Sequence, residues 1–468
     1  MISLPEQFKK RMERMLADEY DGFIESYDEP AVRSVRISMM RTRGKDIEKL
    51  ASYITGMPAP EEVSWCPNAF YYTDDAAPGK LALHDAGVFY IQEASAMYPV
   101  TVLGIDGSGL KVLDLCAAPG GKTTQIADLM DSSGLLVANE IIPSRADILS
   151  ENVERMGASN VLVVNEDPMA LAKRFPAYFD RILVDAPCSG EGMFRKNPEA
   201  VNEWSPENVK MCAKRQKMLL TCASSMLAEG GRIVYCTCTF SPEEDEGAIE
   251  SFLAENPGFA LAGQHRLYPH THRGEGHFAA VLCRASDLSS AAGCSGRASG
   301  PISDSARKKG GFSPKGGRKQ FDDALLRSFL EDTLRPGSTV RQTIENCQER
   351  LISFGDSLYL APAAMPDISG LKIKRAGLKL GTFKKNRFEP DHALSHVLGP
   401  DDVYNCIDLD PDGDEIRNYL SGLTISCSAD IRGWCLIAAG SFGTGWGKAS
   451  SSTVRNHYPA GIRRRAFR

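Results

Sequence analysis

Two cysteines and an aspartate stand where neighbouring strands of a parallel sheet would end. Asp185 and Cys188 belong to the segment Asp-Ala-Pro-Cys-Ser-Gly, which follows a short apolar run. Cys238 lies in Tyr-Cys-Thr-Cys-Thr, which ends the next apolar run. A lone cysteine is usually a packing residue, but two thiols and a carboxylate that converge on one crevice indicate chemistry.

This set of groups suits the methylation of a cytosine at carbon 5, which is a weak nucleophile by itself. A thiolate that adds to carbon 6 turns the ring into an enamine, and the enamine can attack a methyl group on a sulfonium. Protonation of the ring at N3 helps the addition, and the carboxylic acid of Asp185 is the candidate donor. A second cysteine can serve when the carbon-5 proton leaves and the first thiol is expelled. Periodicity alone leaves open which cysteine attacks.

A loop of small residues is suited to a cofactor, because it follows a predicted strand and opens a predicted helix whose N-terminus faces the ligand. The loop consists of Cys116, Ala117, Ala118, Pro119, Gly120, Gly121, Lys122 and Thr123. A phosphate-binding P-loop needs glycine where Cys116 stands, and a dinucleotide loop needs a third glycine. S-adenosylmethionine, which has no pyrophosphate to bind, fits this loop best.

Two acidic residues extend this interpretation. Glu140 ends the second predicted strand, about 20 residues after the glycines, where an acid can bind ribose hydroxyls. Asp167 ends the third strand and can accept a hydrogen bond from an adenine amino group. Each acid alone is more often a solvated loop residue, but ligands of doubly wound sheets bind at the carboxyl ends of strands. Acids at successive strand ends therefore favour a cofactor site.

The elements that position these residues alternate regularly from Lys111 onward. Apolar runs predict strands at 112–115, 135–138, 161–164, 181–184, 232–235 and 277–282, and amphipathic segments predict helices from about 123, at 144–156, at 206–228 and from about 242. Strands that alternate with helices indicate a parallel sheet covered on both faces. We therefore expect an α/β, Rossmann-like, doubly wound fold.

The 468 residues are too many for one compact core and divide into four predicted parts. These are a mixed, mostly helical N-terminal RNA-binding region (1–100), a catalytic domain (101–285), a flexible basic linker (286–320) and a smaller α+β or mainly β region (321–468). The first 21 residues suggest an amphipathic helix rather than a signal peptide. No uncharged apolar run is long enough to span a bilayer, so we expect a cytoplasmic protein.

Composition argues against several kinds of site. The 13 cysteines are odd in number and include no Cys-x-x-Cys pair, which argues against a disulfide framework and a zinc ribbon. Four histidines gather at His265, His270, His272 and His277. No cysteine or acid at ligand spacing completes a closed metal site around them, so no metal is predicted.

The charge distribution is more informative than the net charge of −6. Residues 371–388 carry seven Lys or Arg and no acid, and the last six residues carry four arginines. Local basic faces on an acidic chain are typical of an enzyme that binds a polyanion at chosen surfaces. A solvated, fold-supporting face explains either cluster equally well.

Four segments together resemble the NOL1/NOP2/Sun family of RNA cytosine-5 methyltransferases over about residues 20–285. They are segments 92–97, 114–123, 185–190 and 237–239. The resemblance implies a class I S-adenosylmethionine-dependent fold, with Cys238 as nucleophile and Cys188 as the helper in product release. It also implies cofactor contacts from 116–122, Glu140, Asp167 and Asp185.

Two positions stand apart from the family pattern. Cys236 has no implied role, because the family commonly has Ser there, yet strand alternation turns it to the same side as Cys238 and leaves a swap of roles open. The family often has Asn two residues after an Arg, but Arg36 is followed by Ile37 and Ser38. Any RNA contact expected from that Asn therefore stays open.

Segments near the C-terminus resemble the extension of a branch of this family that methylates small-subunit ribosomal RNA and carries a PUA-like RNA-binding module. They are segments 377–383, 387–390, 443–448 and 456–459. The resemblance implies 16S ribosomal RNA, or the small ribosomal subunit, as the partner. We expect the enzyme to be a monomer. Two alternatives remain, the same chemistry on transfer RNA and a non-catalytic RNA-binding protein of ribosome assembly. An NAD-dependent oxidoreductase is disfavoured by the missing glycine.

Overall fold

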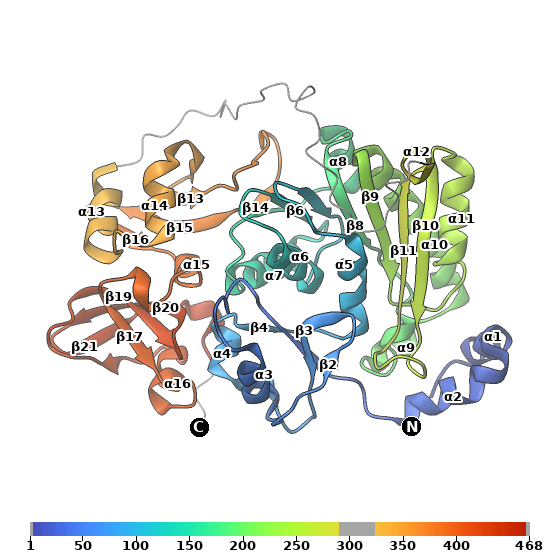
Figure 1. Ribbon diagram of the computed structural model, residues 1–468, viewed down its shortest axis with the longest axis horizontal. Helices are drawn as coiled ribbons and strands as arrows, with labels where there is room; N and C mark the ends of the chain where they lie inside the picture. The colour runs from blue at the N-terminus through green and yellow to red at the C-terminus, as the bar shows by residue number, and fades with distance from the viewer. Residues whose placement is uncertain (1–2, 290–322, 465–468) are drawn as a thin grey trace.

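A mixed eight-stranded sheet forms the centre of the computed structural model, which describes residues 3–289 and 323–464 (Figure 1). Its strand order is β10-β11-β9-β8-β5-β6-β7-β14. The bounds are β5 Lys111–Asp114, β6 Leu135–Asn139, β7 Val161–Val164, β8 Phe179–Asp185, β9 Leu227–Thr237, β10 Phe259–Leu267, β11 His277–Arg284 and β14 Ile373–Ala376. The strand order reverses between β5 and β8, the place where sheets of this kind bind ligands.

The expected parallel sheet is confirmed for β5 to β9, but the whole sheet is not parallel. Strands β10, β11 and β14 pair antiparallel to their neighbours. The link from β10 to β11 is only the segment 268–276, too short for the crossover that a parallel neighbour requires. Strand β10 was not predicted: its short apolar start, 259–262, is followed by Gly263 and polar residues, and most of its side chains are half-buried or exposed.

Helices cover both faces of the sheet because successive strand residues point to opposite sides. Their bounds are α5 Tyr98–Leu103, α6 Gly121–Leu129, α7 Pro143–Arg155, α8 Pro168–Arg174, α9 Pro198–Glu203, α10 Pro206–Met226 and α11 Glu246–Glu255. Leu113 packs in the cluster that includes α8, α10 and α11, and its neighbour Val112 packs with α5, α6 and α7. The acidic helix α11 begins at Glu246, later than the predicted start near 242.

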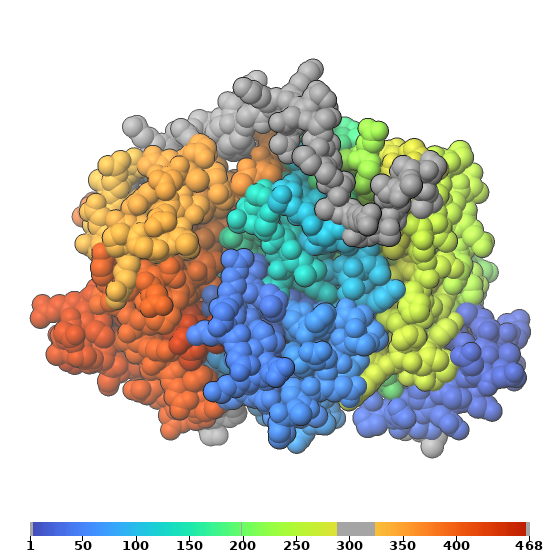
Figure 2. Space-filling view, in the orientation of Figure 1, coloured from blue at the N-terminus to red at the C-terminus, as the bar shows by residue number. Residues whose placement is uncertain are grey.

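The N-terminal region contains a four-stranded sheet of order β2-β3-β1-β4, seated between the catalytic domain and the C-terminal region (Figures 1 and 2). The bounds are β1 Ser34–Ile37, β2 Glu62–Val63, β3 Cys66–Tyr71, β4 Phe89–Ile91, α1 Glu6–Leu16, α2 Tyr20–Glu25, α3 Ile47–Thr55 and α4 Ala82–Asp85. The predicted amphipathic helix corresponds to α1, which buries Phe8 and Met12 against Phe194 and Trp204 of the catalytic domain.

The C-terminal region holds two further sheets, of orders β12-β13-β15-β16 and β17-β19-β20-β21-β18. The bounds are α13 Asp323–Thr333, α14 Thr339–Asn346, β12 Leu351–Phe354, β13 Ser357–Leu360, β15 Leu378–Lys384, β16 Arg387–Pro390, α15 His392–Ser395, β17 Cys406–Leu409, α16 Asp414–Leu420, β18 Ile425–Ser426, β19 Gly433–Ala439, β20 Phe442–Ser450 and β21 Thr453–Asn456. Strand β14 leaves this region and pairs with β7, which joins it to the catalytic sheet.

Helix α12 (Ala285–Ser289) covers the start of the predicted linker, and the rest of 286–320 lies outside the described residues. Among the helices that the structure describes, none is both long and apolar enough to cross a membrane.

Candidate active site

The loop after β5 is held close to α7, and this closeness explains its glycine. Gly120 has φ +116°, and a Cβ at this position would lie 3.2 Å from Leu149 Cδ1. The loop carbonyls are bound from the same side, since Asn152 Nδ2 donates to Pro119 O at 2.9 Å and Arg145 Nη2 donates to Ala118 O at 2.9 Å. Helix α6 therefore begins beside a fixed backbone turn.

A cavity of about 220 Å³ opens between this loop and the N-terminal region. Its lining includes the predicted residues Ala117, Ala118, Pro119, Gly121, Lys122 and Asp185, together with Tyr90, Ile91, Gln92, Glu93, Ala96 and Asp114. The second group has no predicted role, although the segment 92–97 is one of the family motifs. The structure thus brings six predicted site residues together and adds a wall from the N-terminal region.

Asp114 is a polar residue of this cavity to which the sequence assigned no function. Its Oδ2 accepts from Thr123 Oγ1 at 2.6 Å, whereas its buried Oδ1 has no partner among the described residues. Burial raises the pKa of this carboxyl to about 7. An unpartnered acidic oxygen on a cavity wall suits a cationic ligand group such as an ammonium.

Four predicted cofactor residues lie outside the cavity lining: Gly120, which forms the turn described above, and Cys116, Glu140 and Asp167. Glu140 is 4% exposed and accepts from Ile142 N at 2.9 Å. Asp167 is exposed, and its Oδ1 caps helix α8 by accepting from Met169 N at 2.8 Å. Cys116 is half-buried, and burial raises the pKa of its thiol well above the ordinary value. Their contacts with a cofactor stay predictions.

The sulfur atoms of Cys188 and Cys238 lie 3.4 Å apart. The loops that carry them are tied together, because Gly192 N donates to Cys238 O at 2.8 Å and the hydroxyls of Ser189 and Thr239 are 2.8 Å apart. The contact with Cys238, together with burial, raises the pKa of the Cys188 thiol well above its ordinary value. Cys188 therefore stays a protonated thiol that can donate to the sulfur of Cys238.

Asp185 is joined to both the cofactor loop and the end of β9. Lys122 Nζ lies 2.8 Å from its Oδ2, and the thiol of Cys236 donates to its Oδ1 at 3.5 Å. Burial raises the pKa of Asp185, but the Lys122 ammonium, together with His277 and the Cys236 thiol, holds that pKa below its ordinary value. In the free protein this group is a carboxylate that accepts hydrogen bonds, rather than the carboxylic acid that the sequence suggested.

Cys236 and Cys238 differ in their surroundings. Cys236 is fully buried, and burial raises the pKa of its thiol well above the ordinary value. Cys238 is partly exposed. Burial lowers the pKa of the Lys122 ammonium, but the Asp185 carboxylate outweighs burial and, with the neighbouring cysteines, holds that pKa above its ordinary value.

The four histidines of the C-terminal part of the catalytic domain do not form one cluster. His265 and His272 pack against each other, whereas His270 Nε2 is 3.0 Å from Glu19 Oε2. His277 lies elsewhere, with a ring nitrogen, a carboxylate oxygen of Asp185 and the sulfur of Cys236 all within 4.8 Å of one another. The Lys122 ammonium beside Asp185 repels a divalent cation at this place, so the absence of a metal remains our prediction.

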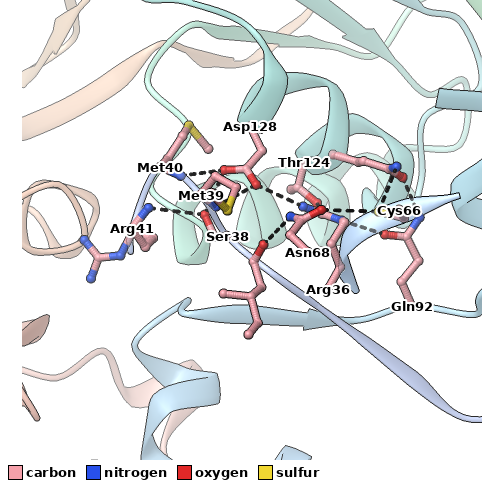
Figure 3. A network of polar contacts seen from close by, with 12 residues as sticks. Arg36, Ser38, Met39, Met40, Arg41, Cys66, Asn68, Gln92, Thr124 and Asp128 are labelled. Carbon is pink, nitrogen blue, oxygen red and sulfur yellow. Dashed lines mark hydrogen bonds and ion pairs between the residues drawn. The ribbon is translucent and has the colours of Figure 1, made fainter. Parts of the chain in front are cut away.

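Arg36 fastens the N-terminal sheet to helix α6 (Figure 3). Its buried guanidinium donates to Thr124 Oγ1 at 2.9 Å and lies 3.4 Å from Asp128 Oδ2. The Asp128 carboxylate also accepts from Ser38 Oγ at 3.0 Å and from the backbone amides of the two following residues. Ser38, which stands where the family often has Asn, therefore serves this junction between domains.

The basic surfaces expected from the sequence are partly used inside the protein. In segment 371–388, Lys374, Arg375, Lys379 and Arg387 each pair with a carboxylate. Beside the cofactor cavity, Arg33, Arg195 and Lys196 line a second cavity of about 390 Å³, where Arg195 also pairs with Glu275 and Arg33 with Asp74. This second cavity shares residues 91–93 with the first, so cationic side chains stand next to the predicted cofactor site.

Family models match most of the chain. Residues 105–283 match the model described as 16S rRNA methyltransferase RsmB/F, and residues 4–94 match the N-terminal domain of 16S rRNA methyltransferase RsmF. Residues 328–398 match the RsmF rRNA methyltransferase first C-terminal domain, and residues 406–464 match the methyltransferase RsmF PUA domain. These last two matches coincide with the two C-terminal sheets.

Individual proteins are similar over nearly the full length. Ribosomal RNA small subunit methyltransferase F of Vibrio vulnificus (strain YJ016) is 31% identical over 482 residues, which cover 98% of this chain and 97% of the relative. The protein of the same name from Escherichia coli O127:H6 is 30% identical and covers 98% and 96%. A solved methyltransferase homolog protein from Pyrococcus horikoshii has a TM-score of 0.51 at 26% identity, covering 59% of this chain and 94% of its own.

Proposed function

This chain belongs to the RsmB/F family of 16S rRNA methyltransferases, and we propose that it methylates carbon 5 of a cytosine in 16S rRNA through a covalent bond from Cys238 to carbon 6. The methyl donor is S-adenosylmethionine. The observation that carries the covalent mechanism is the 3.4 Å contact between the sulfurs of Cys188 and Cys238.

The residues of the first cavity fit S-adenosylmethionine. The unpartnered Oδ1 of Asp114 suits the ammonium of the methionine part, and the glycine turn at 120–121 allows close approach of the backbone. Glu140 and Asp167 would hold the ribose and the adenine, because they end successive strands at the edge where such sheets bind ligands. When bound, this cofactor supplies an electrophilic methyl group at the crevice.

The side chains at the crevice divide the reaction among them. The Cys238 thiolate forms the sulfur–carbon bond at carbon 6. Before the attack, the Cys188 thiol stabilises that thiolate by donating a hydrogen bond to it. The Asp185 carboxylate favours the ring form that carries a proton on N3, because an N3–H can donate to it. Once carbon 5 carries the methyl group, a water molecule takes up the carbon-5 proton. The ring double bond re-forms, Cys238 leaves as a thiolate that accepts a hydrogen bond from the Cys188 thiol, and the N3 proton returns to solvent.

Two surfaces would bind the RNA that enters this crevice, one on the C-terminal PUA domain and one around the second cavity. The PUA domain at 406–464 and the cations of the second cavity are the features that support RNA binding. A target base inside a structured RNA has to leave its stack to meet Cys238. We propose that the protein is cytoplasmic and that its active form is a monomer. Light scattering of the purified protein tests the monomeric state.

Bisulfite sequencing tests the proposed function. A strain that lacks this protein is complemented with the wild-type chain or with Cys238→Ala, and 5-methylcytosine is mapped in total RNA. We expect one or more 16S rRNA signals that only the wild-type chain restores. If the 16S rRNA signals stay unchanged and a transfer RNA signal changes, the substrate is transfer RNA instead. Equal signals from both complemented strains would refute the catalytic role of Cys238.

A further inference from the structure

His277 stands in the active site, although neither the sequence motifs nor the proposed mechanism uses it. It begins β11, whose register pairs Phe278 with Thr237 and Ala279 with Cys236. One step further, His277 therefore comes opposite Cys238. Since directly paired residues of an antiparallel sheet share a face, the imidazole is on the side of both cysteines. This position agrees with the distances in the site, where a ring nitrogen of His277, a carboxylate oxygen of Asp185 and the sulfur of Cys236 lie within 4.8 Å of one another.

The imidazole presents an unused lone pair to this site. His277 is 3% exposed, and its Nε2 has no hydrogen-bond partner among the described residues. We assign the proton of the neutral imidazole to Nδ1, because Nε2 is the ring nitrogen that has no partner, and this assignment leaves the lone pair on Nε2. A buried acceptor without a donor is costly, so a donor from the substrate is the natural partner.

A role as general base does not suit this residue. Burial and the neighbouring Lys122 ammonium lower the pKa of His277 to about 3. A base that works near neutral pH needs a pKa close to that pH. His277 is thus a permanently neutral hydrogen-bond acceptor beside the permanently charged acceptor Asp185.

We propose that His277 Nε2 accepts a hydrogen bond from the exocyclic 4-amino group of the target cytosine and so selects cytosine over uracil. This inference rests on the proposed function. A cytosine with a protonated N3 offers two neighbouring donors, N3–H and the 4-amino group, which match Asp185 and His277. Uracil carries an oxygen at position 4, and its lone pairs would face that of His277. A site built around such a contact rejects a base that lacks the donor.

The test combines a change in the protein with a change in the base. A synthetic 16S rRNA fragment carries, at the mapped target, either cytidine or the 2-pyrimidinone ribonucleoside, which lacks only the 4-amino group. Single-turnover methyl transfer is measured for wild type, His277→Phe and His277→Gln. We expect wild type to prefer cytidine by about tenfold or more, in line with one hydrogen bond to a buried acceptor. His277→Phe should lose that preference by slowing on cytidine alone, and His277→Gln, which keeps an acceptor, should retain part of it.

The outcomes separate the inference from the proposed function. If His277→Phe slows both RNAs by the same factor, or keeps the wild-type preference, the amino-group contact is refuted. Cofactor affinity and melting temperature of each variant show whether the fold and the cofactor site are intact, and His277→Gln alone decides the matter if His277→Phe does not fold. Failure of the wild type to methylate either RNA would instead contradict the proposed function.

Discussion

Cys188 and Cys238 come from loops after different strands, β8 and β9, yet their sulfur atoms lie 3.4 Å apart. Strands β8 and β9 pair in parallel with Asp185 opposite Cys236, so both loops leave the same edge of the sheet. At this distance one thiol donates a hydrogen bond to the other. This sulfur pair is the basis of the first two predictions.

Replacing each cysteine by alanine should have opposite effects on covalent intermediates. Cys188→Ala removes the group that assists release, so a covalent complex of protein and RNA should accumulate with cofactor present. Cys238→Ala removes the attacking sulfur and should give no complex and no methylation. Denaturing gel electrophoresis with labelled 16S rRNA measures both. A complex formed by Cys238→Ala would assign the attack to another residue, with Cys236 the first to examine.

Mild peroxide should join the same two sulfurs. A disulfide bond is about 2.05 Å long, so the thiols need to approach by about 1.4 Å. Peroxide takes up the two hydrogens and is reduced to water. We expect a linked pair of peptides containing Cys188 and Cys238 by mass spectrometry, with loss of activity that dithiothreitol reverses. An oxidised protein that lacks this linked pair would show that the sulfurs do not approach.

Removing the Lys122 charge should change the acidic limb of the pH–rate profile. In the wild type, burial raises the pKa of Asp185, but Lys122, together with His277 and Cys236, holds it below its ordinary value, so the carboxylate persists far below neutral pH. In Lys122→Met the main opposing charge is lost, the pKa of Asp185 rises, and kcat/KM at saturating cofactor should fall at a higher pH. Lys122→Arg keeps the cation and serves as the matched control. An unshifted limb in Lys122→Met would contradict this coupling.

Cofactor affinity should depend on pH through Asp114. Its pKa of about 7 means that the carboxylate, which attracts an ammonium, forms as the pH rises through 7. S-adenosylmethionine should therefore bind roughly tenfold more tightly at pH 8 than at pH 6, since each pH unit below the pKa costs about a factor of ten. Calorimetric titration measures this affinity. In Asp114→Asn binding should be weaker and the dependence lost; a variant with the same slope would exclude Asp114.

The Arg36–Asp128 contact should hold the N-terminal region to the cofactor loop (Figure 3). Asp128→Asn leaves the guanidinium of Arg36 buried without a counter-charge, which costs about 3 kcal/mol. Ser38→Ala, the matched control, removes one hydrogen bond to the same carboxylate and costs about 1 kcal/mol. Thermal unfolding should show a larger drop for Asp128→Asn, accompanied by weaker cofactor binding. Equal melting temperatures in the two variants would contradict the role of this ion pair.

Local sequence patterns were enough to predict the central strands and the residues at their ends. Five apolar runs correspond to β5 to β9, and the small residues after β5 form the expected turn. The presence of a strand can be predicted locally, because a short run of apolar residues favours a buried strand whichever strands become its neighbours. The positions of Asp185, Cys188 and Cys238 at one edge of the sheet followed from this alternation of strands and helices.

Pairing between distant segments was decided only by the tertiary structure. Strand β14, from beyond the linker, completes the sheet beside β7, and nothing in its four residues specifies that neighbour. His277 reaches the active site through its register with β9, and Lys122 fixes the charge of Asp185 across 63 positions of the chain. Register and charge state depend on which groups meet in space and on how much water is excluded around them, which sequence spacing does not encode.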